Sequence, residues 1–264
     1  MKKLITFILL IAHSSLGFAN VTLDEKLNLL IASYPSLLSH VDPEYLYAKD
    51  GTKWLIDDKK VKNHKEKLVG ADIQDTLEQI YPLENCATQA DVNFDPGRIR
   101  SQSLLKFLFG DNKQQVGKNT QQIDWFGQKL AMTKNHGAAE ALIRVQKELS
   151  QYPKLKMYLT PSAGTFNWRN ISGTNRLSVH SFAAAIDLNT KYAAYWKWSS
   201  SKGKVTPYKN QYPSKIISIF EKHGFIWGGR WYHYDTMHFE FRPELIAIAN
   251  AHKCSNEENK GDKN

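Results

Sequence analysis

Two short apolar runs in the C-terminal half constrain the fold more than any other feature of the sequence, because each carries a group that is costly to bury. Ile186-Asp187-Leu188 places an aspartate inside a strand-like run, and His238-Phe239-Glu240-Phe241 begins with an imidazole. A carboxylate flanked by apolar residues needs a cation or strong hydrogen-bond donors when it is buried. The two runs therefore predict buried strands that meet at a metal ion.

The pattern around these runs indicates an α+β fold. Strands are expected at 155–160, 186–188, 225–227 and 237–241. Helices and short strands that do not alternate regularly are typical of α+β architecture rather than of a doubly wound sheet. Two amphipathic helices are expected, one with Ala138, Ala141, Leu142, Val145 and Leu149 on a single stripe ended by Pro153, the other with Ile216, Ile217 and Phe220 ended by Gly224.

The N-terminus has the pattern of a secretory signal peptide over residues 1–19. Lys2 and Lys3 precede an apolar stretch, and Gly17-Phe18-Ala19 forms a small-x-small cleavage site. The apolar stretch, Leu4–Ala12, is shorter than the roughly 20 residues that span a bilayer. We therefore expect an exported protein without stable membrane insertion.

Charge and cysteine content limit the partners of such a protein. The net charge of +9 falls to +7 when Lys2 and Lys3 are removed, and a basic surface attracts anionic polymers. Export argues against nucleic acid and favours an anionic cell-wall polymer. Cys86 and Cys254 are able to pair outside the cytoplasm, although their spacing leaves a disulfide open. Nothing in the sequence indicates the oligomeric state.

Residues 20–130 follow as helices and loops, with a turn at Asp95-Pro96-Gly97, and a polar tail occupies residues 252–264. Residues 20–130 carry no recognisable chemistry, so we expect a mainly helical accessory region of unknown role. The chemistry is expected within residues 131–251.

Three residues of the second half supply the donor set of a catalytic zinc site. His180, Asp187 and His238 offer two imidazoles and one carboxylate, which leave a fourth position open for water. Asp235, three residues before His238, suits a general base. Arg169 and Arg176, upstream of His180, are alternative cations for stabilising an oxyanion. His233 is a rival ligand, whereas His40, His64, His136, His223 and His252 have no partnered pattern.

Gly164–Asn189 and Trp227–Glu244 together resemble the M15 family of zinc peptidases, which act on bacterial and phage cell walls. The shared pattern is S-x-H with an aspartate seven residues after the histidine, then a distant acid-x-x-His followed by an aromatic residue. The resemblance covers roughly residues 135–246. It implies a small antiparallel sheet flanked by helices, as in the DD-peptidase and hedgehog-like zinc peptidases, with one Zn²⁺ per chain in a domain at 131–251.

The resemblance also implies a role for each site residue. His180, Asp187 and His238 would bind zinc and Asp235 would be the base. Arg169 would steady the substrate carbonyl, with Arg176 as the alternative. Ser178, Arg176 and Trp231 would contact substrate. Ala183 departs from the family, whose members commonly carry glycine there.

With the resemblance, these features predict a bacterial zinc-dependent peptidase, exported to the periplasm or secreted to the cell surface, that hydrolyses amide bonds in peptidoglycan stem peptides. Whether it is a DD-carboxypeptidase or an LD-endopeptidase stays open, because loops such as 192–212 form the pocket walls. The alternative is a non-catalytic wall- or peptide-binding module on the same fold. A degenerate module would be expected to lack Asp235 or a ligand, and this chain retains them all.

Overall fold

The computed structural model describes residues 21–83, 90–199 and 205–252. The predicted signal peptide, Cys86, Cys254 and residues 253–264 of the polar tail lie outside the described residues. No helix within the described ranges is long and apolar enough to cross a membrane.

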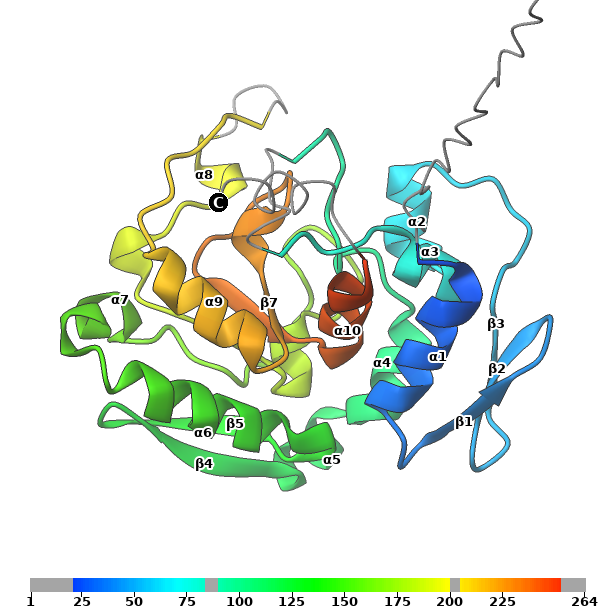
Figure 1. Cartoon of the computed structure of the whole chain (residues 1–264), viewed down its shortest axis with the longest axis horizontal. Helices are drawn as coiled ribbons and strands as arrows, with labels where there is room; N and C mark the ends of the chain where they lie inside the picture. The colour runs from blue at the N-terminus through cyan, green and yellow to red at the C-terminus, as the bar shows by residue number, and fades with distance from the viewer. Residues whose placement is uncertain (1–20, 84–89, 200–204, 253–264) are drawn as a thin grey trace, which may run out of the picture.

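The N-terminal region, blue to cyan in Figure 1, lies along one side of the molecule. Its first helix begins at a capping box in which Thr22 and Glu25 satisfy each other's backbone N–H groups. Its three strands form an antiparallel sheet in the order β1-β2-β3. The elements are α1 (Leu23–Ser33), β1 (Leu38–Val41), β2 (Tyr45–Ala48), β3 (Lys53–Leu55), α2 (His64–Gly70) and α3 (Ile73–Glu78).

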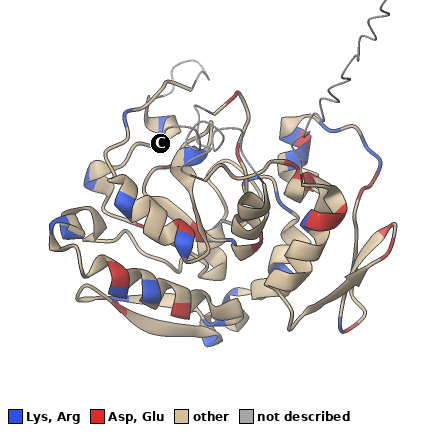
Figure 2. Cartoon of the chain, viewed as in Figure 1, with Lys and Arg blue, Asp and Glu red and all other residues tan. Residues whose placement is uncertain are grey.

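The middle of the chain contains an antiparallel hairpin covered by a long amphipathic helix, α6, whose apolar stripe is buried. Figure 2 shows charged residues of both signs along the same helix. Figure 1 shows this green layer below the rest of the molecule. The elements are α4 (Gln102–Phe109), α5 (Lys113–Lys118), β4 (Thr120–Trp125), β5 (Gln128–Thr133), α6 (Ala138–Leu149) and α7 (Lys156–Leu159), with short 3₁₀ turns at Asn135–Gly137 and Pro153–Leu155.

A three-stranded antiparallel sheet of order β6-β8-β7 forms the centre of the C-terminal half. Helix α10 packs against α1 and β7, which joins the two halves of the chain. The elements are β6 (Ala185–Asp187), α8 (Trp196–Ser199), α9 (Ser214–Lys222), β7 (Phe225–Trp227), β8 (His238–Phe241) and α10 (Pro243–Ala251), with 3₁₀ turns at Val179–Phe182, Thr190–Tyr192 and Gly228–Arg230.

The central sheet separates two apolar clusters. Ile186 and Phe239, paired across β6 and β8, pack into the cluster formed with α6, α9 and the β4–β5 hairpin. Ala185 and Ile226 pack into the cluster formed with α1, α4 and α10. Because side chains alternate along a strand, the face of β8 opposite Phe239 carries His238 and Glu240.

The fold class is confirmed as α+β with small antiparallel sheets. Both amphipathic helices form, and Gly97, at φ +94°, closes the expected turn after Asp95. The strand predicted at 155–160 is wrong, because these residues form a 3₁₀ turn and one turn of helix. Leu159 is fully buried there, whereas Met157 is 52% exposed, so the apolar residues do not share a strand face.

Residues 20–130 differ from the expected helices and loops by two β elements, the β1–β3 sheet and strand β4 of the hairpin. The short strands of the sheet lack a long alternating pattern, and the hairpin turns at Phe126-Gly127, where both residues have positive φ. The expected boundary near residue 130 falls inside β5.

A buried chain of alternating charges links the C-terminal sheet to α1. Glu240 accepts from Arg242 at 3.3 Å, and Arg242 Nε donates to Glu244 at 2.6 Å. The hydroxyl of Tyr34, which follows α1, donates to the other oxygen of Glu244 at 2.6 Å. Glu240, Arg242 and Glu244 are each 2% exposed. Buried ions of this kind persist because each is paired and hydrogen-bonded.

We predict that Tyr34→Phe lowers the free energy of unfolding by about 2 kcal/mol, because it removes a hydrogen bond to a buried charged group. Urea denaturation would measure the change. Tyr47→Phe is the matched control, since the Tyr47 hydroxyl donates to the solvent-accessible Asp42 at 2.7 Å. Equal losses in the two variants would contradict a special contribution of the buried chain.

Candidate metal centre

Strand register places two of the three predicted ligands side by side. Asp187, the last residue of β6, pairs directly with His238, the first residue of β8. The 3₁₀ turn at Val179–Phe182 brings His180 to the same point. His180 Nε2 lies 3.1 Å from Asp187 Oδ1 and 3.2 Å from His238 Nδ1, and His238 Nδ1 lies 2.9 Å from Asp187 Oδ1. The three donor atoms therefore face one another.

The second nitrogen of each imidazole has its own partner. His180 Nδ1 lies 2.7 Å from the carbonyl oxygen of Thr165, and His238 Nε2 lies 3.1 Å from Glu240 Oε2. A carbonyl and a carboxylate accept, so each of these nitrogens carries a proton, and the facing nitrogens are the ones left to bind a cation. Partners of this kind orient metal-binding histidines.

The carboxylates and imidazoles of the centre shift one another's pKa values. Burial lowers the pKa of His238, but hydrogen bonds to Asp187 and Glu240 outweigh burial and raise the pKa to about 10. Burial raises the pKa of Asp187, but the two imidazoles hold it well below its ordinary value. The carboxylates thus attract a cation at the point where the three donor atoms converge.

The three donors fit a zinc ion in both chemistry and spacing. Two imidazole nitrogens and one carboxylate oxygen are a common catalytic zinc set, with bonds of about 2.0–2.1 Å. In a tetrahedral site such bonds separate neighbouring donors by about 3.3 Å. The observed separations of 2.9–3.2 Å are close to this value, so little movement would be needed.

Asp235 lies beside the donors, in the segment that joins β7 to β8. Its backbone N–H donates to Gly228 at 3.0 Å, and a side chain at Gly228 would approach the Asp235 carbonyl oxygen to 2.5 Å. Burial, with Asp187 nearby, raises the pKa of Asp235 to about 6. Its Oδ1 atom is buried and has no hydrogen-bond partner among the described residues. A carboxylate in this state is suited to exchanging a proton.

A cleft of about 280 Å³ contains the donors and Asp235. Four arginines line it and outnumber its three carboxylates, Asp187, Asp235 and Glu240: Arg98, Arg100, Arg169 and Arg176. Arg98 and Arg100 come from the half of the chain in which the sequence indicated no chemistry. Only their proximity to the Asp95-Pro96-Gly97 turn could have singled them out.

The two candidate oxyanion arginines differ in their surroundings. Arg176 is partly buried and donates to the carbonyl oxygen of Arg98, and burial together with Arg98 lowers its pKa to about 10. Arg169 is exposed at the edge of the cleft. Arg169 is therefore the more available of the two to a ligand.

Ser178 and Trp231, the remaining predicted site residues, both line the cleft. Ser178 Oγ accepts from the backbone N–H of His180 at 3.4 Å, which caps the turn that carries this ligand. The Trp231 ring lies 5.7 Å from the His238 ring, and its Nε1 donates to Pro96 at 2.7 Å. Trp198, 63% exposed, adds an apolar surface to the cleft.

His233, the rival ligand, does not join this group. Its side chain instead meets Asp95 and His64 in a separate cluster. Neither His64 nor Asp95 was a candidate, because their neighbours in the sequence carry no paired pattern.

Residues 172–241 match the family model described as D-alanyl-D-alanine carboxypeptidase, of the M15 peptidases. The matched segment contains His180, Asp187, Asp235 and His238. It begins three residues after Arg169, which it therefore does not include. It supports peptidase activity and confirms the resemblance seen in the sequence. Searches of curated proteins and of solved structures gave no significant match.

The turn that carries His180 ends at Ala183, at φ +51° and fully buried. This left-handed conformation favours glycine, which explains the residue common in the family. We predict that Ala183→Gly changes the free energy of unfolding by less than about 1 kcal/mol. Relief of about 1–2 kcal/mol of backbone strain offsets the lost methyl, about 0.8 kcal/mol, and the added chain entropy.

Ala184→Gly is the matched control for this variant, since Ala184 is equally buried but lacks a positive φ. It should lose about 1.5 kcal/mol in the same denaturation experiment, from the methyl and the entropy together. Equal losses at the two positions would contradict the strain at Ala183.

Proposed function

We propose that this protein is a zinc-dependent peptidase that hydrolyses an amide bond in peptidoglycan stem peptides. His180, Asp187 and His238 would hold the zinc ion. The observation that carries the proposal is the meeting of these donor atoms, within 3.2 Å of one another, with a buried carboxylate in one cleft. The family match over residues 172–241 supports the same activity.

The chain's own residues divide the remaining work. When bound, zinc supplies a Lewis acid and lowers the pKa of a coordinated water to about 7. Asp235 accepts a proton and passes it to the leaving amine. Its pKa of about 6 suits transfer near neutral pH. Arg169 is exposed beside the cleft. It stabilises either the negative charge that develops on the substrate carbonyl or the charge of a carboxylate that the substrate carries.

The cationic walls of the cleft favour a substrate with a free carboxylate. Arg98, Arg100, Arg169 and Arg176 line it together, and arginine matches carboxylate geometry well. A carboxypeptidase acts next to a C-terminal carboxylate, whereas an endopeptidase need not. We therefore favour the carboxypeptidase type, in agreement with the description of the matched family.

Export completes the proposal. The signal-peptide pattern of residues 1–19 would deliver the enzyme to the periplasm or cell surface, where peptidoglycan lies. The net charge of +7 that remains after cleavage suits an anionic wall polymer.

Asp235→Asn tests the general base. We predict a loss of kcat of about 10²–10⁴-fold, since an amide cannot accept the proton, with bound zinc retained because the three ligands are intact. Muropeptide products measured by mass spectrometry and zinc measured by elemental analysis would check both parts. Asp124→Asn is a control at an exposed hairpin carboxylate.

Unchanged product release by Asp235→Asn would exclude this residue as the base. A wild-type chain that binds zinc and muropeptide yet releases no product would instead support the non-catalytic binding module.

Arg169→Gln tests carboxylate recognition. Loss of a charge-assisted hydrogen bond worth about 1.5–3 kcal/mol should lower kcat/KM about 10–100-fold for a pentapeptide with a free C-terminus, and less for its C-terminal amide. Arg144→Gln, on the exposed face of α6, is the matched control. Equal cleavage of acid and amide by the wild type would favour the endopeptidase type.

A further inference from the structure

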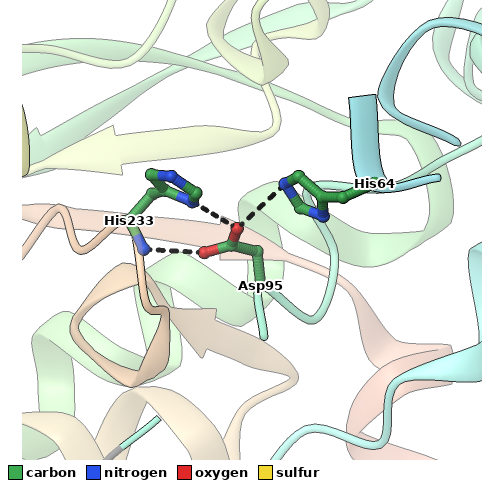
Figure 3. A group of neighbouring side chains, drawn as sticks. All are labelled: His64, Asp95 and His233. Atoms are coloured by element: carbon green, nitrogen blue, oxygen red, sulfur yellow. Dashed lines mark hydrogen bonds and ion pairs between the residues drawn. The ribbon is translucent and has the colours of Figure 1, made fainter. Parts of the chain in front are cut away.

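A second group of metal-binding side chains lies apart from the His180 centre. It consists of His64, Asp95 and His233 (Figure 3). His64 is the first residue of α2, Asp95 begins the turn before Arg98, and His233 lies in the segment between β7 and β8. Three segments that are far apart in the sequence therefore meet at one point.

The donor atoms of this cluster converge on a single carboxylate oxygen. His233 Nδ1 lies 2.6 Å from Asp95 Oδ2, and His64 Nε2 lies 3.5 Å from the same oxygen. The backbone N–H of His233 donates to Asp95 Oδ1 at 2.8 Å, which fixes the carboxylate. Figure 3 shows the two imidazole rings on opposite sides of Asp95, and one donor atom from each residue lies within 4.8 Å of the others.

Burial makes hydrogen bonding alone an incomplete explanation of the cluster. Asp95 is 0% exposed, whereas the side chains of His64 and His233 are 18% and 19% exposed. His64 Nε2 is buried and makes no hydrogen bond within the part of the chain that the structure describes. A buried ring nitrogen without a hydrogen-bond partner is costly, and a cation held between it and the buried carboxylate would satisfy both groups. The partial exposure of both rings leaves a route from solvent.

We infer that His64, Asp95 and His233 form a second binding site for a divalent cation of the zinc class. Two imidazole nitrogens and one carboxylate oxygen suit zinc and related transition ions. Calcium and magnesium prefer oxygen ligands and are disfavoured. The site differs in residues and place from the His180 centre, so it does not depend on the proposed peptidase activity.

Two of the three donor separations are close to those of a tetrahedral site, and the third, between the two imidazole nitrogens, is at most 4.8 Å. Neighbouring donors in a tetrahedral site lie about 3.3 Å apart, so the 3.5 Å separation of His64 from Asp95 already fits. The 2.6 Å contact between His233 and Asp95 would open by about 0.7 Å. The proton that His233 Nδ1 shares with Asp95 leaves when the ion binds.

The surroundings predict weaker binding than at the His180 centre. Arg98 donates to the carbonyl oxygen of His233 at 3.1 Å and so adds a positive charge beside the site. The Trp196 ring packs edge-on against the His233 ring, with centroids 4.6 Å apart, and limits its rotation. We expect this site to fill after the His180 centre.

A bound ion would connect α2, the turn that leads to Arg98, and the segment that carries Asp235. Asp235 follows His233 by two residues, and Arg98 follows Asp95 by three. The ion would thereby fix two walls of the cleft without touching substrate.

Metal stoichiometry of the untagged full chain tests the inference. After chelation, Zn²⁺ would be added back and measured by calorimetry and elemental analysis. The wild type should bind two ions, the weaker one absent from both His64→Ala and His233→Ala. His238→Ala should lose the tighter ion and keep the weaker. His40→Ala, at an exposed histidine of β1, is the matched control and should keep both. Ca²⁺ should not replace Zn²⁺ at the weaker site.

Saturation of the wild type at one ion that is lost in His238→Ala would overturn the second site, whatever the folding of the variants. Two ions in the wild type, both retained in folded His64→Ala and His233→Ala, would also overturn it. Failure of the proposed zinc centre at His180 gives a different result, namely that His238→Ala keeps the same number of ions as the wild type, and absence of peptidase activity alone leaves both ion counts unchanged.

Discussion

The pairing of β6 with β8 in one register is the constraint on which the rest of the structure depends. It sets Asp187 opposite His238, and Ile186 opposite Phe239 on the other face. Because side chains alternate along a strand, a slip of one residue would turn the donors into the apolar cluster and the phenylalanine into the cleft. The same register therefore stabilises the core and assembles the candidate metal centre.

The buried chain from His238 through Glu240, Arg242 and Glu244 to Tyr34 joins this centre to the N-terminal region. Each charge in it is compensated by the next, so none is left alone in a low-dielectric interior. The first half of the chain, residues 20–130, also supplies Arg98 and Arg100 to the cleft. It is thus part of the site's support and walls rather than a separate appendage.

Local patterns predicted the elements whose apolar residues follow one clear pattern along the chain. Helix α6 and helix α9 have complete apolar stripes, and β7 and β8 have apolar runs. The prediction failed at 155–160, where three apolar residues fit a strand or a helical turn equally well, and Pro153 begins a 3₁₀ turn. The β1–β3 sheet was missed because its short strands are only partly buried and carry no continuous buried apolar run, unlike β7 and β8.

The amino-acid sequence by itself determined the residue types and spacing of the candidate centre, because S-x-H, the following aspartate and the acid-x-x-His pattern are local. Only the tertiary structure decided that Arg98 and Arg100 line the cleft and that His64 and Asp95 meet His233. Those contacts join segments far apart in the chain, and their proximity depends on how α2 and the 95–97 turn pack against the segment between β7 and β8. No local periodicity records such packing.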